Sequence, residues 1–152
     1  MVIGVISDTH GLLRPEAAAA LRGVDRIIHA GDIGAPEILD ALGAIAPVSA
    51  VRGNNDHGAW AQAVPHTQAV DAGGVLVYVI HDVGELDVDP VAGGFGVVVA
   101  GHSHRPRNEL RDGVLWFNPG SAGPRRFKLP IAVGRLTIES GRARGEILTL
   151  EG

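Results

Sequence analysis

The feature that most constrains the fold is a series of short apolar runs, each of which leads to a polar motif. The motifs are Asp8-Thr9-His10, Gly31-Asp32, Gly53-Asn54-Asn55-Asp56, His81 and Gly101-His102-Ser103-His104. The first apolar run covers residues 2–6 without interruption. Such a run is typical of a strand that is covered on both faces. The pattern therefore predicts sheets whose strand ends carry polar side chains.

The first third of the chain alternates strands and helices. Strands are predicted at residues 2–6, 26–28 and 48–51, and helices at residues 15–22 and 36–42. Pro15 and Pro36 begin the two helices, and Gly23 and Gly43 end them. This βαβαβ pattern predicts a parallel sheet with right-handed crossovers.

Hairpins follow from about residue 66 onward. Predicted strands at 68–71 and 75–80 form one hairpin that leads to His81, and a strand at 95–100 leads to His102. Asp112-Gly113 is a strong turn signal between strands at 109–111 and 114–117, and residues 131–150 form a closing hairpin. We predict one domain over residues 1–152, with two packed sheets and helices outside them.

Composition narrows the class of protein. The 152 residues are 45% apolar and 20% charged, and the net charge of −4 offers no basic footprint for nucleic acid. The absence of cysteine excludes disulfides, thiolate zinc sites and cysteine nucleophiles. No stretch has the length of a transmembrane helix, and the first apolar run is too short for a signal peptide. We expect a cytoplasmic protein without a membrane partner.

The polar motifs contain the ligand types that borderline divalent metals prefer. Imidazole, carboxylate and amide oxygen together suit Mn, Fe, Ni or Zn. The candidate ligands exceed the needs of one tetrahedral ion and fit two ions that share a bridging ligand; they are Asp8, His10, Asp32, Asn54, His81, His102 and His104. All of them follow predicted strands, and ligands of parallel α/β sheets bind beyond the carboxyl ends of strands.

Local geometry gives each motif a specific expectation. An extended backbone would direct the side chains of Asp8 and His10 to the same side. Gly31 and Gly101 precede ligands, where glycine permits positive φ and close backbone approach. Taken alone, each motif also has a structural explanation, such as a helix cap or a turn. Their joint occurrence at strand ends favours metal binding, whereas His29 is expected to be a buried, hydrogen-bonded residue.

In this order, the motifs resemble those of the calcineurin-like metallophosphoesterases, and in particular the small single-domain bacterial and archaeal phosphodiesterases. Asn118-Pro119-Gly120-Ser121 followed by Pro124-Arg125 resembles a further signature of that subgroup. The resemblance extends from residue 3 to about residue 138. It implies a four-layer α/β/β/α sandwich of two mixed sheets.

The resemblance also implies a role for each ligand. Asp8, His10 and His104 would bind the first metal, Asn54, His81 and His102 would bind the second, and Asp32 would bridge the two. A hydroxide between the ions would attack phosphorus in line. Mn²⁺ is the expected metal, with Ni²⁺, Fe²⁺ and Zn²⁺ as alternatives.

Two polar residues are expected to act beside the ligands. Asp56 would hold the turn of its motif or orient a neighbouring ligand, and Asn118 would touch the site or form a turn after its strand.

The chain departs from the larger family members at two points. Asn55 occupies the position of a histidine that can protonate the leaving group, and an amide cannot supply that general-acid assistance, worth roughly 10²–10⁴-fold. This favours esters with good leaving groups, or a proton from water or from another histidine such as His10 or His57. Between His81 and Gly101, several glycines and a proline leave room for only a short helix.

Three functions remain open from the sequence. The leading one is a metal-dependent phosphodiesterase that acts on a small phosphoester. A protein-interaction scaffold is the first alternative, because a retromer subunit has the same fold. A phosphomonoesterase or nucleotide hydrolase is the second, which Asn55 disfavours. The sequence also leaves open whether the chain forms a homo-oligomer.

Overall fold

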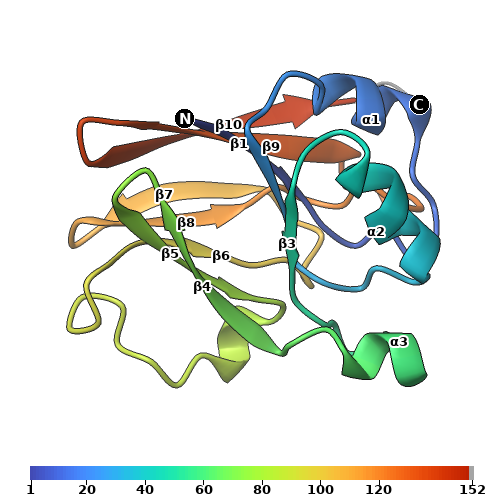
Figure 1. Cartoon of the computed structure of the whole chain (residues 1–152), viewed down its shortest axis with the longest axis horizontal. Helices are drawn as coiled ribbons and strands as arrows, with labels where there is room; N and C mark the ends of the chain where they lie inside the picture. Colours follow the sequence, from blue (N-terminus) through green and yellow to red (C-terminus); the bar gives the residue numbers. More distant parts are fainter. Residues whose placement is uncertain (151–152) are drawn as a thin grey trace.

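Two mixed five-stranded sheets form the body of the computed structural model, which describes residues 1–150 (Figure 1). The first sheet has the order β10-β9-β1-β2-β3. In chain order its strands are β1 (Val2–Ile6), β2 (Arg26–His29), β3 (Val48–Ala50), β9 (Ala132–Glu139) and β10 (Arg142–Thr149). The first three are parallel, and β9 joins β1 and β10 in antiparallel fashion.

The second sheet has the order β4-β5-β6-β8-β7, with a parallel centre and antiparallel outer strands. Its strands are β4 (Thr67–Ala72), β5 (Val75–Ile80), β6 (Phe95–Val99), β7 (Arg107–Arg111) and β8 (Val114–Asn118). The predicted α/β fold of two mixed sheets is confirmed. Predicted strand ends differ from these bounds by one or two residues.

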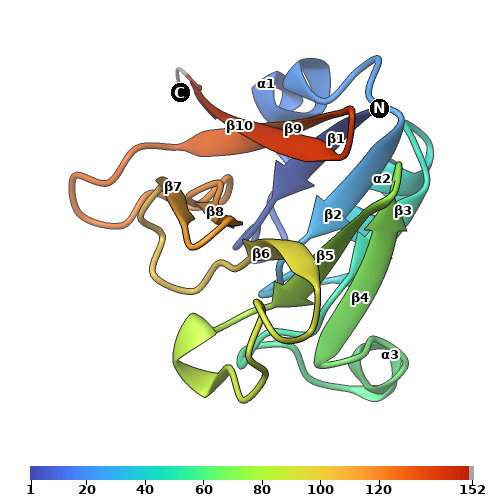
Figure 2. The same cartoon turned by 90° about the vertical axis from the view of Figure 1, so that its left-hand side faces the viewer.

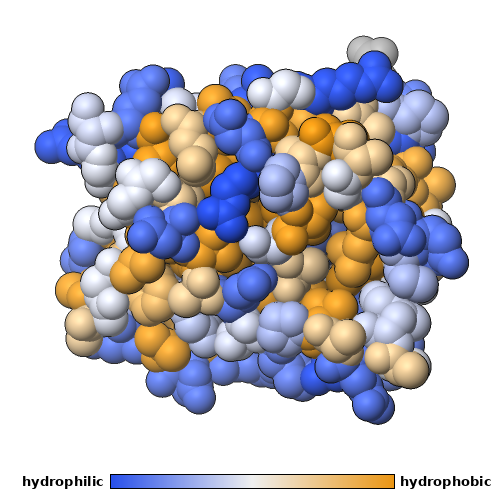
Figure 3. Space-filling view, viewed as in Figure 1, coloured by the Kyte–Doolittle hydropathy of each residue, from blue (hydrophilic) through white to orange (hydrophobic). Residues whose placement is uncertain are grey.

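The two sheets pack face to face around an apolar core. Alternation along β1 places Ile3 and Val5 in this core, where they are joined by Val77, Val99 and Phe117 from the second sheet. Figure 3 shows hydrophilic residues along the periphery and apolar residues over the middle of the molecule. The burial of these side chains fixes the two sheets against each other, and with them the loops at the strand ends.

Within residues 1–150, the α-helices lie on the side of the first sheet. They are α1 (Pro15–Ala20), α2 (Pro36–Gly43) and the unpredicted α3 (Ala59–Gln62). Leu21, which directly follows α1, and Leu42, which lies in α2, pack with Ile6 and Ile27 of the sheet. Trp60 of α3 packs against this cluster and is partly buried. Figure 2 shows α1 and α2 on this side of the sandwich.

Irregular backbone covers the outer face of the second sheet. The segment between β5 and β6 contains one short 3-10 helix, η1 (Val83–Glu85). Leu86 and Val88 from this segment pack on Tyr78 and Val98 of the sheet. The fourth layer of the sandwich is therefore a loop rather than a helix, because glycine and proline in this segment oppose helix formation. No helix in residues 1–150 is long and apolar enough to cross a membrane.

Candidate metal centre

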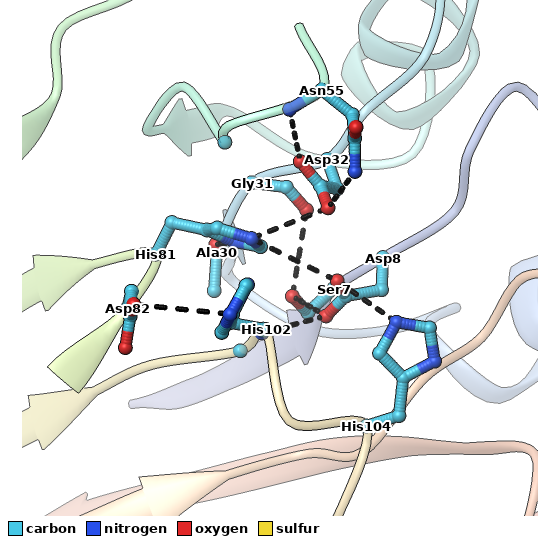
Figure 4. Close-up of polar contacts among 12 residues, drawn as sticks. Ser7, Asp8, Ala30, Gly31, Asp32, Asn55, His81, Asp82, His102 and His104 are labelled. Atoms are coloured by element: carbon cyan, nitrogen blue, oxygen red, sulfur yellow. Dashed lines mark hydrogen bonds and ion pairs between the residues drawn. The ribbon is translucent and has the colours of Figure 1, made fainter. Parts of the chain in front are cut away.

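The loops after β1, β2, β5 and β6 meet at one edge of the sandwich (Figure 4). Backbone hydrogen bonds tie the first two together, with the amide of Asp8 donating to the carbonyl of Gly31 and that of His10 to the carbonyl of Asp32, both at 2.9 Å. The amide of Gly101 donates to the carbonyl of His81 at 2.9 Å, and this bond joins the loop after β6 to the loop after β5. Distant segments thus present their polar side chains to a common point.

Asp8, His10 and His104 form a first group of donor atoms. The Oδ1 atom of Asp8 lies 3.3 Å from Nε2 of His104 and 3.9 Å from Nε2 of His10. Asp8 and His104 are buried, while the His10 side chain is 25% exposed. This group can surround one cation.

Asp32, His81 and His102 form a second group beside the first. Oδ2 of Asp32 lies 3.3 Å from Nε2 of His81 and 3.6 Å from Nε2 of His10, a member of the first group. Oδ1 of Asp8 in turn lies 4.0 Å from Nε2 of His81. The two groups therefore share a boundary made of two carboxylates, with Asp32 close to a histidine of each group.

Left-handed backbone is concentrated in these loops. Among residues 1–150, eight non-glycine residues have positive φ, and five of them are predicted ligands: Asp8, His10, Asp32, His102 and His104, at 57°, 47°, 55°, 68° and 61°. The expectation of extended backbone at Asp8 and His10 is therefore wrong. Such conformations cost about 1–3 kcal/mol each and cluster at functional sites, where the surrounding structure enforces them.

Two glycines allow the loops to approach each other. Gly31 has φ of +100°, so a side chain there would be strained. Gly101 has ordinary φ, but a Cβ atom at that position would collide with the side chains of Ser7 and Asp8. A Cβ atom at Gly31 would also collide with the His81 ring, so this glycine serves both backbone conformation and close packing, whereas Gly101 serves close packing alone.

Hydrogen bonds fix the carboxylate of Asp8. Its Oδ2 atom accepts from Oγ of Ser7 at 2.6 Å and from the amide of His102 at 3.1 Å, so Oδ1 is the atom that faces the histidines. Burial raises the pKa of Asp8, but contacts with His104, Ser7 and His81 outweigh it and hold that pKa below its ordinary value. Sequence reasoning missed Ser7, although a serine directly after an apolar run was a visible signal.

The orientation of His81 suits a metal ligand. Its Nδ1 atom lies 2.7 Å from the carbonyl oxygen of Ala30, to which it must donate, so Nε2 faces the carboxylates. Metal-binding histidines commonly donate their other ring N–H in this way.

Four buried polar atoms of the centre have no hydrogen bond within residues 1–150; they are Asp8 Oδ1, His10 Nε2, His81 Nε2 and His104 Nδ1. Buried polar atoms without partners are costly, and cations held by the two donor groups would satisfy the first three. The residues therefore fit divalent metal.

Residues 1–141 match the family model described as the calcineurin-like phosphoesterase superfamily domain. This chain belongs to the calcineurin-like phosphoesterase superfamily. A relative from Methanothermobacter thermautotrophicus named "Probable metallophosphoesterase" is 37% identical over 97% of this chain and 92% of its own length. Another, from Methanocaldococcus jannaschii, has the same description and is 35% identical over 91% of this chain and 77% of its own. The family assignment predicts a metal-dependent hydrolase of phosphoesters.

Solved structures agree with this calcineurin-like phosphoesterase fold. A structure described as a novel archaeal phosphodiesterase has a TM-score of 0.80 and 26% identity, and covers 97% of this chain and 100% of its own. Vps29 of Chaetomium thermophilum has a TM-score of 0.78 but only 18% identity, over 99% of this chain and 100% of its own. The Vps29 likeness therefore concerns the fold alone.

Within this calcineurin-like phosphoesterase centre, Asn54 and Asn55 lie in different surroundings. Asn54 is exposed and lines a cavity of about 580 Å³ together with His81 and His102. Asn55 instead binds Asp32, with its backbone amide donating to Oδ1 at 2.9 Å and its side-chain Nδ2 to Oδ2 at 3.0 Å. Burial raises the pKa of Asp32, but His81 and these two bonds lower it well below its usual range. Sequence reasoning noted only that Asn55 is no acid and missed this contact.

Asp56 and Asn118 form hydrogen bonds that hold the loops of the centre. The carboxylate of Asp56 accepts from the amides of Ile33, Gly34 and Gly53 at 3.1, 2.9 and 2.9 Å. Asn118 donates through Nδ2 to the carbonyl of Gly101 at 3.0 Å and to Oγ of Ser103 at 3.2 Å. Neither contacts the donor groups directly, and both hold the loops that carry them.

His29 joins the first two loops from within. It is fully buried, and burial lowers its pKa to about 4, so the ring is neutral at pH 7. Its Nδ1 accepts from the amide of Gly31 at 3.1 Å, so Nε2 carries the proton and donates to Oγ1 of Thr9 at 3.0 Å. The hydroxyl of Thr9 in turn donates a hydrogen bond to the carbonyl of Ile33 at 2.8 Å. The other two histidines outside the centre, His57 and His66, are exposed.

Proposed function

We propose that this chain is a phosphodiesterase that works with two divalent metal ions, of which Mn²⁺ is the expected one. The observation that carries the proposal is the position of Asp32. Its Oδ2 lies within 3.6 Å of a histidine of each donor group, as a carboxylate shared by two ions requires. Asp8 and Asp32 both ionise readily, since their pKa values are lowered.

Each residue of the centre has a role in this proposal. Asp8, His10 and His104 hold one ion, His81, His102 and Asn54 hold the other, and Asp32 serves both. When bound, two such ions supply hydroxide near neutral pH and neutralise charge on the phosphoryl oxygens. Ser7 and Asn55 orient the two carboxylates so that their remaining lone pairs face the ions.

The absence of a general acid restricts which leaving groups can depart. The Asn55 amide donates to Asp32 and cannot protonate a departing alkoxide. The histidines nearest the reacting position are ligands in this proposal, so they are not free to act as acids. We therefore expect esters with stable leaving groups to react, and the likeness to an archaeal phosphodiesterase favours diesters over the matching monoesters.

The test is an assay of metal-free protein reloaded with Mn²⁺, Ni²⁺, Fe²⁺ or Zn²⁺ in turn. Bis(4-nitrophenyl) phosphate and 4-nitrophenyl phosphate share a leaving group, so their rates compare diester with monoester. We expect faster diester turnover. Faster monoester turnover would contradict the diesterase preference, and no turnover of either ester with any of these ions would contradict the enzyme.

A scaffold is the second candidate, and the Vps29 likeness favours it because Vps29 has this fold. The donor groups argue against it, since a module that only binds proteins does not require them. The two candidates separate in the His102→Ala variant. If the chain is an enzyme, His102→Ala should lose the turnover that the wild type shows. If it is a scaffold, neither protein should show turnover, and both should form the same protein contacts.

A further inference from the structure

A second cavity, of about 330 Å³, lies beside the metal centre near the ends of β6 and β8. Its apolar lining includes Val83 of η1, Val98 of β6 and Trp116 of β8. Val98 is buried and Trp116 is partly exposed, on the face of the second sheet that the irregular segment covers. The cavity therefore presents one large aromatic side chain and an apolar floor to a ligand.

This cavity is continuous with the metal centre. His102 and Asp82 line both this cavity and the larger one that contains Asn54. Oδ2 of Asp82 lies 3.8 Å from Nε2 of His102, while its Oδ1 accepts from the amide of Gly84 at 2.9 Å. A molecule whose phosphoryl group lies at the metal centre can thus extend past His102 into the second cavity.

The two cavities differ in chemistry. Asp82, Glu85 and Asp87 line the larger one together with Arg52 and His66, so its lining is strongly polar and carries more carboxylates than cations. Arg105 and Arg107 line the smaller one, and the guanidinium carbon of Arg107 lies 5.2 Å from the centre of the Trp116 ring. An ion pair of 3.1 Å with Glu109 holds Arg107 in place. Aromatic surface next to a guanidinium suits a planar apolar group attached to an anion.

We propose that the smaller cavity binds an aromatic arm of a phosphodiester whose phosphoryl group lies at the metal centre. This inference rests on the proposed function and specifies its substrate class. A phosphodiester has two arms and one negative charge, and the centre is flanked by two cavities of different polarity. The aromatic arm packs on Trp116, and the other arm lies in the larger, more polar cavity.

The test compares the binding of two stable diesters to the Mn²⁺-loaded protein. Diphenyl phosphate and diethyl phosphate carry the same charge and differ in their arms. We expect diphenyl phosphate to bind about tenfold more tightly by calorimetry, the size of effect that aromatic packing produces. In Trp116→Ala the ratio of the two dissociation constants should fall to about one. An unchanged ratio in that variant would overturn the inference.

A second variant guards against loss of folding at Trp116. Val83 is 38% exposed on η1, so Val83→Asp places a charge in the cavity at a tolerant position, and it should likewise abolish the preference. Leu110→Ala is the matched control, because Leu110 is 70% exposed and does not line this cavity. A preference that survives in Val83→Asp, or that disappears in Leu110→Ala, would contradict the assignment.

Fluorescence reports the contact directly. The chain has two tryptophans, so Trp60→Phe leaves Trp116 as the single tryptophan, which can be excited selectively beside the one tyrosine. Diphenyl phosphate should change its emission and diethyl phosphate should not; equal responses would contradict the contact. Turnover of methyl 4-nitrophenyl phosphate, measured in parallel, separates the two proposals. Turnover without an aryl preference rejects only the cavity assignment, whereas an aryl preference without turnover rejects the phosphodiesterase.

Discussion

The two halves of the metal centre differ in how firmly the fold holds them. Asp8 and His104 are at most 3% exposed, and the loops that carry Asp8 and His10 are fixed by backbone bonds and by His29. In the other half His81 is buried, but the His102 side chain is 44% exposed, against 25% for His10 in the first half, and Asn54 is exposed as well. The first half is thus built into the core, and the second half opens onto both cavities. We infer that the first half retains its ion and that the second exchanges ion and substrate.

The largest expected effect comes from neutralising the carboxylate that lies at the boundary between the two halves. Asp32→Asn should weaken both ions together by at least about 100-fold, more than the 10–100-fold cost of losing a residue that only supports a ligand. Calorimetric titration of metal-free protein with Mn²⁺ measures this, with Asp82→Asn as the control because Asp82 contacts only His102 of the ligands. Loss of a single ion in Asp32→Asn would show that the carboxylate belongs to one half.

Removing the support of that carboxylate should have the next largest effect. Asn55→Ala removes the side-chain bond to Asp32 and keeps the backbone bond, so we expect a 10–100-fold loss of affinity at both ions. Asn54→Ala is the neighbouring control and should affect only the ion of the open half. Titration curves of the two variants that coincide would contradict the different roles given to these asparagines.

The comparison of the halves predicts an order of metal release. In wild-type protein the two ions should bind in distinct steps, and His102→Ala should abolish only the weaker step. His104→Ala should abolish the tighter step, since His104 belongs to the buried half. Metal content after dialysis against a graded series of chelator concentrations measures this. The opposite assignment of steps would mean that burial does not govern retention.

The smallest effect concerns the support of the buried half by His29. Its pKa is about 4 in the folded protein against 6.5 in the unfolded chain, so the unfolded chain binds the extra proton between these values. Stability should therefore fall by about 1 kcal/mol per unit as pH drops from 6.5 towards 4. Urea unfolding of metal-free wild type and His29→Gln at pH 7, 6 and 5 isolates this slope. Parallel pH profiles of the two proteins would exclude His29 as its source.

The sequence predicts the strands and the meeting of the ligands for one physical reason. Continuous apolar runs such as residues 2–6 become strands that are buried on both faces, and the carboxyl ends of parallel strands share one edge. The polar residues that follow the runs must then converge. Family resemblance added the fold class, which the comparisons with known proteins confirm.

The features that the sequence does not reveal depend on contacts between distant segments. Asn55 and Asp32 are 23 positions apart, and their bond exists only after β2 and β3 have paired. The left-handed backbone at Asp8 and His10 is likewise enforced by the tertiary structure against local preference. For the segment between β5 and β6, the sequence predicts only that a long helix is absent. Glycine and proline oppose helix formation, but they do not specify which irregular structure covers the second sheet.

We infer that two ions share Asp32, and electron paramagnetic resonance of the Mn²⁺-loaded protein can detect this sharing. With two Mn²⁺ ions bound per chain, we expect a spectrum of two coupled ions that is lost in Asp32→Asn. A wild-type spectrum of isolated Mn²⁺ ions at that loading, or a coupled spectrum that persists in Asp32→Asn, would contradict it.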